Sequence, residues 1–388
     1  DAQEFLRIEN LAEPCVGSCA MLGTANTMGM VAEALGMSLP GCAAIPAVDA
    51  KRMQAGYETG RAVMKLVEKG IRARQILTRE SIENAMALVM ATGGSTNAIM
   101  HLQAIHREAG LGDLPLSHFD AFSRRIPQIA SIYPASPYDM VDFYHAGGVP
   151  AVLHELKSML HLGCMTCTGK ALKENLDGVK PSEMREVIRT VQSPFSRTGG
   201  IAVLQGNLAP LGAIVKPAAI PEQLLTFCGK AQVFQSEQEA VEAIWNGRVQ
   251  KGTCIVLRYE GPKGGPGMPE MYRPMKALEG MDLSDTCALI TDGRFSGSNR
   301  GLFVGHLSPE AYEGSLLALV EDGDEIRIDI PNRILELSVP EAVLQARRSV
   351  WTKPHKEIPD GYLKIYQAAS RSAAEGAVVG AYRDEMEQ

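Results

Sequence analysis

The stretch from Arg258 to Gly301 carries residues whose types and spacing could do chemistry. Glycines and prolines alternate from Gly261 to Pro269, which predicts a loop that is open to a ligand and also stiff. Glu260 and Glu270 flank this run. Further along, an apolar run leads into Asp-Gly-Arg-Phe-Ser-Gly, where Ser296 stands between glycines after a predicted strand. Such a position often presents a nucleophile or a base, so this stretch is the first candidate site.

Cysteine thiols are the second set of reactive groups, at Cys15, Cys19, Cys42, Cys164, Cys167, Cys228, Cys254 and Cys287. Cys19 precedes a predicted helix, Thr24 to Leu35, and the partial positive charge of a helix N-terminus favours the thiolate that binds metals. By position alone, a structural thiol is the more common outcome. Cys164 and Cys167 form a C-x-x-C without a second such pair, which favours reduced thiols in a turn over a metal or redox site.

Two further segments could bind a ligand. A glycine pair followed by Ser-Thr-Asn, residues 93–97, opens a predicted helix, and its free N–H groups could hold a carboxylate or phosphate. A plain turn between helices fits the same residues. His145 stands before another predicted helix that starts at Gly147. A single loop histidine is more often a surface or supporting residue than a catalyst.

The elements that must position these residues change in type along the chain. Up to about residue 180, apolar residues recur at helical spacing, for example in Thr24–Leu35 and Ser81–Ala91. Prolines and glycines interrupt this pattern between Asp177 and Gly200. We therefore predict two domains, residues 1–185 and 186–388.

Short β-like runs dominate the second domain, at Ile201–Leu204, Ala213–Val215, Gln232–Phe234, Cys254–Tyr259, Ala288–Thr291 and Leu316–Val320. Glu325–Val339 alternates apolar and polar residues around a Pro-Asn-Arg turn, which predicts a hairpin. One helix interrupts the strands at Ser236–Trp245, where Ser236 and Glu239 are expected to form a capping box.

Composition limits the classes of partner. The chain has 388 residues, of which 45% are hydrophobic and 21% charged, values typical of a globular protein. Its net charge of −7 gives no basic surface for nucleic acid or anionic membranes. No apolar segment approaches the ~20 residues of a spanning helix, and the first residues do not form a signal peptide. We expect a cytoplasmic protein with a small-molecule ligand. Because the sequence does not start with methionine, we also expect a processed, cut or incomplete chain.

Five segments in order together resemble the iron-sulfur dehydratases, a family that includes dihydroxy-acid dehydratase and the sugar-acid dehydratases. They are Gly17–Met28, Gly93–Asn97, Glu260–Met271, Ala288–Gly301 and Asp329–Arg333. The similarity covers essentially the whole chain. Phe295 and the Ile-Pro-Asn-Arg turn are more similar to the dihydroxy-acid branch than to the sugar-acid branch.

The resemblance implies a fold and two metal groups. The expected fold is an α/β domain, here incomplete, followed by a β-barrel-like domain, with the active site between them. The expected cofactors are an iron-sulfur cluster, with 2Fe-2S favoured over 4Fe-4S, and Mg2+. The front part of the family is not matched in this sequence. It would supply two cluster cysteines, an acidic magnesium ligand and an Asp-Lys pair.

The resemblance also implies residue roles. Cys19 matches the third cluster ligand, and Glu270 matches a magnesium ligand. Ser296 matches the base that removes a proton from the substrate, and Gly297 and Ser298 match groups that hold the substrate carboxylate. Without the family pattern, Ser296 would be read as a capping serine in a turn.

The expected reaction is dehydration of a 2,3-dihydroxy carboxylic acid to a 2-oxo acid in branched-chain amino-acid synthesis. A sugar-acid dehydratase with the same chemistry is the alternative, and a catalytically silent fragment is a further one. We expect a homodimer or a dimer of dimers.

Overall fold

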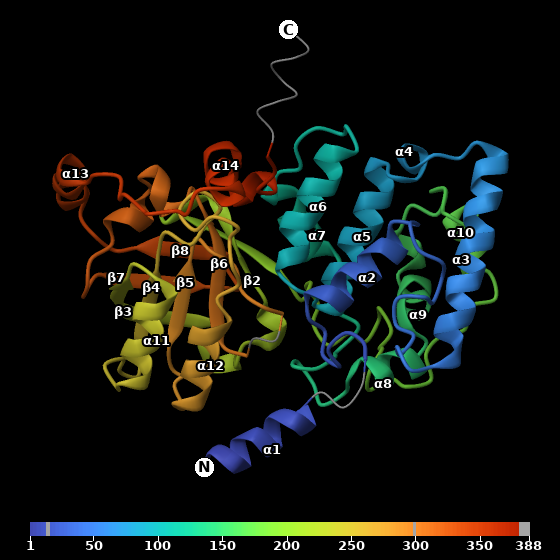
Figure 1. Ribbon diagram of the computed structural model, residues 1–388, viewed down its shortest axis with the longest axis horizontal. Helices are drawn as coiled ribbons and strands as arrows, with labels where there is room; N and C mark the ends of the chain where they lie inside the picture. The colour runs from blue at the N-terminus through green and yellow to red at the C-terminus, as the bar shows by residue number, and fades with distance from the viewer. Residues whose placement is uncertain (13–15, 298–299, 380–388) are drawn as a thin grey trace, which may run out of the picture.

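The computed structural model describes residues 1–12, 16–297 and 300–379, with helices on one side and a β-barrel on the other (Figure 1). The helices are α1 (Ala2–Ala12), α2 (Thr24–Ala34), α3 (Ala50–Lys69), α4 (Ala73–Ile76), α5 (Arg79–Thr92), α6 (Asn97–Glu108), α7 (Leu116–Arg125), α8 (Met140–His145), α9 (Gly148–Glu155), α10 (Leu172–Leu176), α11 (Glu237–Trp245), α12 (Tyr272–Gly280), α13 (Glu341–Val350) and α14 (Tyr362–Ala369). The strands are β1 (Ala202–Gly206), β2 (Ala209–Val215), β3 (Thr226–Phe234), β4 (Thr253–Leu257), β5 (Ala288–Thr291), β6 (Leu302–Ser308), β7 (Glu325–Asp329) and β8 (Ile334–Leu337).

Helix α5 is the centre of the helical side. Eleven of its residues are buried, from Ser81 to Thr92, and it contacts α2, α6, α7 and α9. A helix that is apolar on all sides must be enclosed by other elements, so α5 organises the helices around it. Thr78 caps it by accepting a hydrogen bond from the Ser81 N–H at 3.2 Å, and Gly93 ends it in the left-handed conformation.

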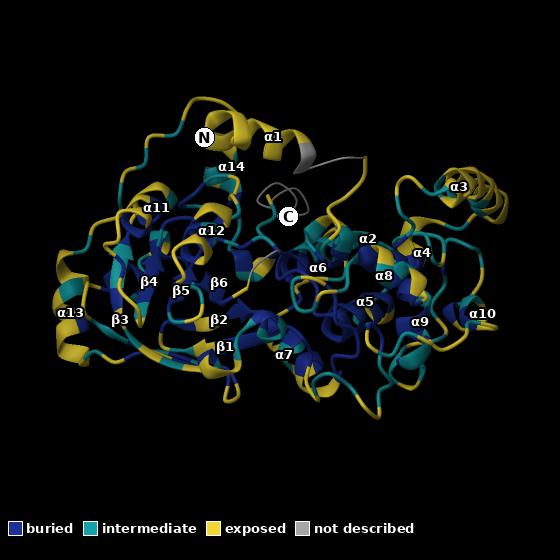
Figure 2. Cartoon of the chain, turned by 90° about the horizontal axis from the view of Figure 1, so that it is seen from below, coloured by how far each residue is buried: buried dark blue, intermediate teal, exposed yellow. Residues whose placement is uncertain are grey.

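Helix α3 lies at the edge of this side. None of its residues is buried, and Met53, Tyr57, Met64 and Val67 are exposed. Figure 2 shows α3 and α1 in the colour of exposed residues, away from the buried centre.

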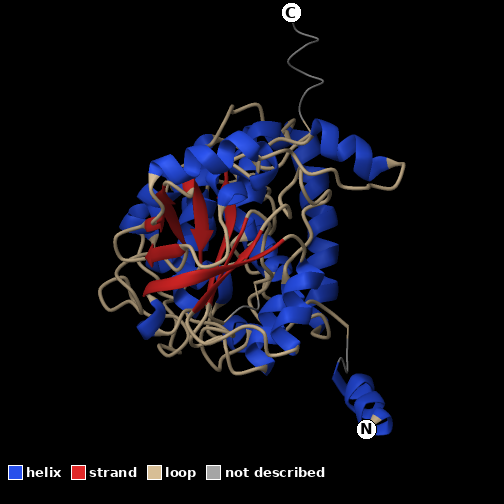
Figure 3. Cartoon of the chain, turned by 90° about the vertical axis from the view of Figure 1, so that its left-hand side faces the viewer, coloured by secondary structure: helices blue, strands red, loops and turns tan. Residues whose placement is uncertain are grey.

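The eight strands close into a barrel in the order β1-β2-β6-β5-β4-β3-β7-β8. Strands β3, β4, β5 and β6 run parallel as neighbours, and a parallel bridge between Gln205 and Ile334 joins β8 to β1. Helix α11 connects β3 to β4 and helix α12 connects β4 to β5, as is usual for crossovers between parallel strands. The strands lie together with helices around them in the side view of Figure 3.

Strands β1 and β2 join the two sides because their two faces pack into different cores. Val203 and Ile214 belong to the core of the helices, while Leu204 and Val215 belong to the core of the barrel. Successive side chains along a strand point to opposite faces, so the same strand can contribute residues to both cores. At the same junction, the Arg333 Nη2 donates to the Ser123 Oγ at 2.9 Å.

The predicted barrel-like domain is confirmed, and so is the hairpin, which is the antiparallel pair β7–β8. Leu316–Val320 was expected to be a strand, but Leu316–Leu319 is a short 3₁₀ helix. Its four apolar residues match a buried strand and a buried turn equally well. Strand β6 was not predicted, because all of its residues are buried and its sequence does not alternate.

One predicted cap differs in the structure, that of α11. The N-cap of α2 is Gly23, while Thr24 and Asn26 bind other groups. Ser236 caps α11 by accepting from the Glu239 N–H at 3.3 Å, whereas the Glu239 carboxylate accepts from the Gln235 N–H at 2.9 Å. The return bond of the expected capping box is therefore displaced by one residue.

None of the helices in the described ranges is both long enough and apolar enough to cross a membrane.

We predict that Gly200→Ala destabilises the protein. A Cβ at Gly200 would lie 3.0 Å from the backbone nitrogen of Gly93 and closer still to its Cα, at the junction of the two sides. Overpacking of this kind costs about 1–3 kcal/mol. Urea unfolding followed by circular dichroism measures the change.

Gly60→Ala is the matched control. Gly60 lies inside α3 with no atom within 4 Å of the added Cβ, so alanine should stabilise the helix by up to about 1 kcal/mol. Equal unfolding midpoints for Gly200→Ala and the unchanged protein would contradict the steric explanation.

Candidate active site

Two loops of the barrel leave the same edge of the sheet and meet there. Strands β4 and β5 are parallel neighbours, so the segments after Leu257 and Thr291 both begin at their carboxyl ends. The first segment returns to the second at Glu270, which pairs with Arg294 in an isolated parallel bridge. The Met271 N–H also donates to the Arg294 carbonyl at 2.7 Å. Glu270 is thereby brought near Ser296.

The side-chain amide of Asn97 connects this edge to the helices. Its Nδ2 donates to the Glu270 Oε1 at 2.6 Å, to the Thr24 Oγ1 at 2.9 Å and to the Phe295 carbonyl at 3.1 Å. Asn97 is fully buried at the start of α6. One amide therefore ties α2, α6 and both barrel loops together.

The starts of α2 and α6 lie against each other beneath this amide. The Thr24 and Ser95 hydroxyls are 2.9 Å apart, and the Ser95 N–H donates to the Thr27 Oγ1 at 3.0 Å. Gly94 has no space for a side chain, because a Cβ there would lie 2.7 Å from the Thr27 Cγ2. The predicted Gly-Gly-Ser-Thr-Asn segment is thus used for close helix packing.

Ser296 and Gly297 lie beside the N-terminus of α2. A Cβ on Gly297 would be 2.7 Å from the Gly23 Cα and 3.1 Å from the Leu22 carbonyl oxygen, so glycine allows the close approach. Ser296 is half-buried. Ser298, the other expected carboxylate-binding residue, lies outside the described residues.

Cys19 is exposed four residues before Gly23. The Asn26 Nδ2 donates to the carbonyls of Cys19 at 2.6 Å and Met21 at 2.7 Å, which holds this segment against α2. Cys19 also lines a cavity of about 350 Å³ together with Arg52 of α3. The hydrogen bonds that the Glu270 side chain makes within the described residues come from Asn97 and Thr24, and none comes from Cys19.

Glu260 has a different environment from Glu270. It is buried and accepts a hydrogen bond from the Glu237 N–H at 3.1 Å. Burial is the main cause that raises its pKa. Its neighbour Asp292 is also buried and accepts from the N–H groups of Tyr259, Glu260 and Ala311. These two carboxylates hold the loops in place, and Glu270 is the carboxylate that meets α6.

His101 was missed in the sequence, although it stands four residues after Asn97 and so on the same side of α6. Burial first, and then the charge of Arg294, lower the pKa of His101. The same two causes lower the pKa of the buried His306 to about 3. His145, by contrast, is exposed at the end of α8, where its ring lies against Tyr144.

Sequence models of a dehydratase family match nearly the whole chain. The N-terminal model of the dihydroxy-acid/6-phosphogluconate dehydratases matches residues 1–175, and the C-terminal model matches residues 186–377. The chain belongs to this dehydratase family.

Curated relatives agree with the family models. The chain is 48% identical over 378 residues to the dihydroxy-acid dehydratase of Caldanaerobacter subterraneus subsp. tengcongensis, an alignment that covers 97% of this chain and 68% of the relative. The dihydroxy-acid dehydratase of Acetivibrio thermocellus is 46% identical over 379 residues, with the same two coverages. That of Methanothrix thermoacetophila is 48% identical over 375 residues, covering 96% of this chain and 68% of the relative. The chain thus spans about two thirds of the length of these dehydratases.

The dehydratase chain offers only part of a metal site in its described ranges. No group of three or more His, Cys, Asp or Glu residues there could enclose a metal ion. Single ligands are nevertheless available. The Glu270 Oε1 accepts hydrogen bonds from the Asn97 amide and the Thr24 hydroxyl, whereas no hydrogen bond among the described residues includes the Glu270 Oε2. The thiol of Cys19 is free and exposed.

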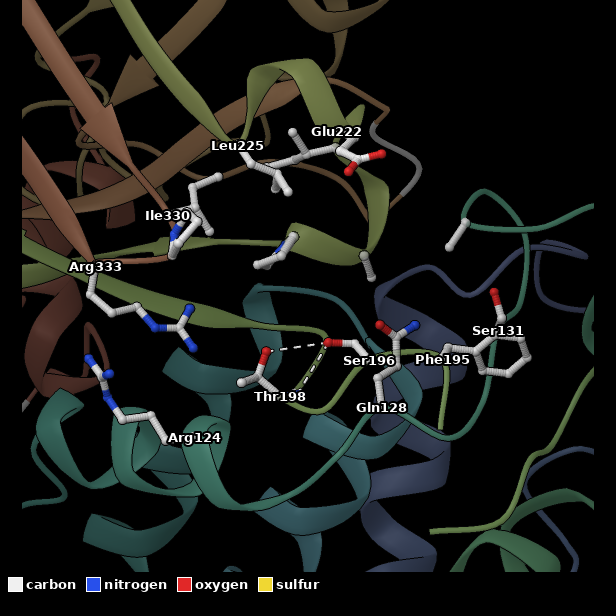
Figure 4. A pocket seen from close by; sticks show the side chains of 16 residues that line it. Arg124, Gln128, Ser131, Phe195, Ser196, Thr198, Glu222, Leu225, Ile330 and Arg333 are labelled. Atoms are coloured by element: carbon white, nitrogen blue, oxygen red, sulfur yellow. Dashed lines mark hydrogen bonds between the residues drawn. The ribbon is translucent and has the colours of Figure 1, made fainter. Parts of the chain in front are cut away.

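A second cavity of about 660 Å³ lies at the junction of the two sides of the dehydratase (Figure 4). Arg124 and Arg333 line one end of it, and Ser196 and Thr198 line its centre. Arg333 already contacts the Asp120 carboxylate at 3.4 Å. None of Cys19, Glu270 and Ser296 lines this cavity, so we do not assign it to the candidate active site.

We predict that Asn97→Ala loosens the junction. The variant leaves the buried Phe295 carbonyl without its amide donor, and an unsatisfied buried group costs on the order of 1–3 kcal/mol. It also removes the 2.6 Å donor of the half-buried Glu270 carboxylate. The free energy of unfolding, measured in urea, should fall by at least this amount.

Asn246→Ala is its control. Asn246 is exposed at the end of α11, and its amide donates to the Glu242 carbonyl at 2.7 Å. This variant should stay within about 0.5 kcal/mol of the unchanged protein, as surface substitutions usually do. If the free energy of unfolding fell equally in the two variants, the hydrogen bonds of Asn97 would not have the stabilising role assigned to them.

Proposed function

We propose that the chain catalyses dehydration of a 2,3-dihydroxy carboxylic acid to a 2-oxo acid, as a dihydroxy-acid dehydratase of branched-chain amino-acid synthesis. The observation that carries the proposal is the meeting of the Glu270 loop and the Ser296 loop at one edge of the barrel, against the starts of α2 and α6. The names of the relatives that align with 96–97% of the chain support the choice of substrate class.

The proposed reaction needs two kinds of assistance. The C2 proton is weakly acidic, and hydroxide is a poor leaving group from C3. An iron-sulfur cluster and Mg2+, when bound, would supply Lewis acidity for both problems. Cys19 would provide a thiolate ligand to the cluster, and Glu270 would provide a hard oxygen ligand to Mg2+. Either group needs further ligands beyond this thiol and this carboxylate.

Asn97 prepares Glu270 for the proposed role. Because its amide fixes Oε1, the carboxylate keeps one orientation, and Oε2 is left for a cation. An oriented ligand binds without losing much side-chain entropy. Glu270 therefore fits the role of one Mg2+ ligand, although the described residues do not supply the other ligands of the site.

Ser296 would take the C2 proton, and Gly297 and Ser298 would hold the carboxylate of the substrate. A serine hydroxyl is a weak base, so it requires nearby positive charge to act as an alkoxide. The close approach of Gly297 to Gly23, the N-cap of α2, supports this role, because the positive end of the α2 dipole would favour an anion near Ser296. The cytoplasmic location and the homodimer expected from the sequence stay predictions.

We predict that Ser296→Ala abolishes turnover while substrate still binds. Removing a general base typically lowers kcat by about 10²- to 10⁴-fold, and a base without a substitute should reach the upper end. Steady-state kinetics on dihydroxy and sugar acids, with C2-deuterated substrate as a second probe, measure the loss and separate the two substrate classes. If the variant kept a tenth of normal turnover with its metals bound, Ser296 would be a positioning residue, and His101 would be the next candidate base.

We further predict that Cys19→Ser bleaches the visible absorption of the metal-loaded enzyme and removes its activity. Serine is a poor ligand for iron compared with thiolate. Cys228→Ser is the matched control, because Cys228 is also exposed but lies on β3, away from α2. Iron and sulfide content, measured with the absorption spectrum, should fall only in the first variant. Full colour in Cys19→Ser would refute the assignment.

A further inference from the structure

Lys216 is a buried lysine without a counter-ion in the described chain. It follows β2 directly, and only 2% of its surface is exposed. No hydrogen bond or ion pair among the described residues includes its ammonium group. Burial alone lowers its pKa, to about 8, with no contribution from a carboxylate.

Other cations with largely buried side chains in the described residues have partners. Arg347 binds the Asp324 carboxylate at 2.6 Å, and Arg333 lies 3.4 Å from Asp120. Burying a charge is costly unless an opposite charge or hydrogen bonds compensate it. The lone position of Lys216 therefore indicates that its anionic partner comes from outside the described residues.

The strand pattern shows which way Lys216 faces. Along β2, Val215 packs into the core of the barrel and Ile214 into the core of the helices. Lys216 directly follows β2, so we infer from the alternation that it lies on the Ile214 side. On the neighbouring strand, Ile214 pairs with Gly305, and the Phe295 ring occupies the space beside Gly305. Lys216 thus lies on the face of the sheet that carries the residue before Ser296.

The residues after Lys216 contact both candidate glycine segments. A Cβ on Gly93 would lie 3.2 Å from the Ala218 Cβ, and the Ala219 carbonyl accepts from the Gly301 N–H at 3.1 Å. The turn that begins at Lys216 therefore lies between the Gly93–Asn97 segment, which it meets at Gly93, and the barrel loop, which it meets at Gly301.

We propose that Lys216 is the counter-ion of the substrate carboxylate, which would bind between these two segments. The inference rests on the proposed function and adds to it a residue on the barrel strand. A lysine ammonium is a compact charge with three donors, and it can pair with one carboxylate while the glycine N–H groups bind the same anion. Lys216 would bind and orient the substrate without exchanging a proton with it.

The test is Lys216→Met in the metal-loaded enzyme. Methionine keeps the apolar stem and removes the charge. The KM for the dihydroxy acid should rise about 10- to 100-fold, as expected for loss of a charged hydrogen bond, while kcat changes less than about threefold. Lys230→Met, on an exposed lysine of β3 that lies 3.5 Å from Glu325, should change neither constant.

Binding without turnover separates this inference from the proposed function. Calorimetry should show that the 2-oxo acid product binds the unchanged enzyme tightly and Lys216→Met weakly, whereas the neutral amide of that product binds both weakly and equally. Thermal unfolding without ligand should show Lys216→Met to be at least as stable as the unchanged protein. Lys216→Gln serves as a second uncharged variant if the methionine variant does not fold.

Two results would overturn the role of Lys216. The first is that Lys216→Met binds the 2-oxo acid as tightly as the unchanged enzyme does. The second is that the substitution weakens binding of the 2-oxo acid and of its neutral amide equally, which would indicate a structural role. An unchanged enzyme that binds the 2-oxo acid through Lys216 but dehydrates no dihydroxy acid would instead refute the proposed function.

Discussion

The amide of Asn97 is the contact on which the arrangement of the candidate site depends. It is buried at the start of α6 and donates to the Glu270 carboxylate, to the Thr24 hydroxyl and to the Phe295 carbonyl. Asp292 and Arg294 already join the two barrel loops to each other, through the Tyr259 and Glu260 N–H groups and the Met268 carbonyl, whereas Asn97 joins these loops to the helices. Because a buried polar group loses much free energy when it is left unpaired, this one side chain fixes the position of the barrel loops against the helices.

Buried charges in this fold divide into two kinds. Asp292 accepts three backbone N–H bonds, and Glu33 accepts from the Gly41 and Ala43 N–H groups, so both carboxylates stabilise loops. Burial still raises the pKa of Glu33 to about 7. Lys216 and the second oxygen of Glu270 have no such partners among the described residues. Other buried atoms in the described residues, among them the Glu310 Oε1 and the His306 Nε2, also lack a partner. Lys216 and Glu270 differ from these because the proposed substrate and cation would complete them.

Local sequence pattern predicted the elements whose two faces differ. The β7–β8 hairpin has one buried face, and its alternation of apolar and polar residues is visible in the sequence. Strand β6 is buried on both faces, so it has no alternation, and Leu316–Leu319 is an apolar run that turned out to be a 3₁₀ helix. A short apolar run predicts that a segment is buried, but it does not predict whether the buried segment is a strand or a helix.

The sequence alone determined the residue types of the site and its family, because a glycine-rich loop, a displayed serine and a thiol before a helix are local features. It pointed to Glu270, Ser296 and Cys19 without showing what each one contacts. Only the tertiary structure decided that Asn97 meets Glu270 across 173 positions of the chain, and that Lys216 is buried without a partner among the described residues. The physical reason is that such contacts depend on how strands close into a barrel and how helices pack against it, and no short segment carries that information.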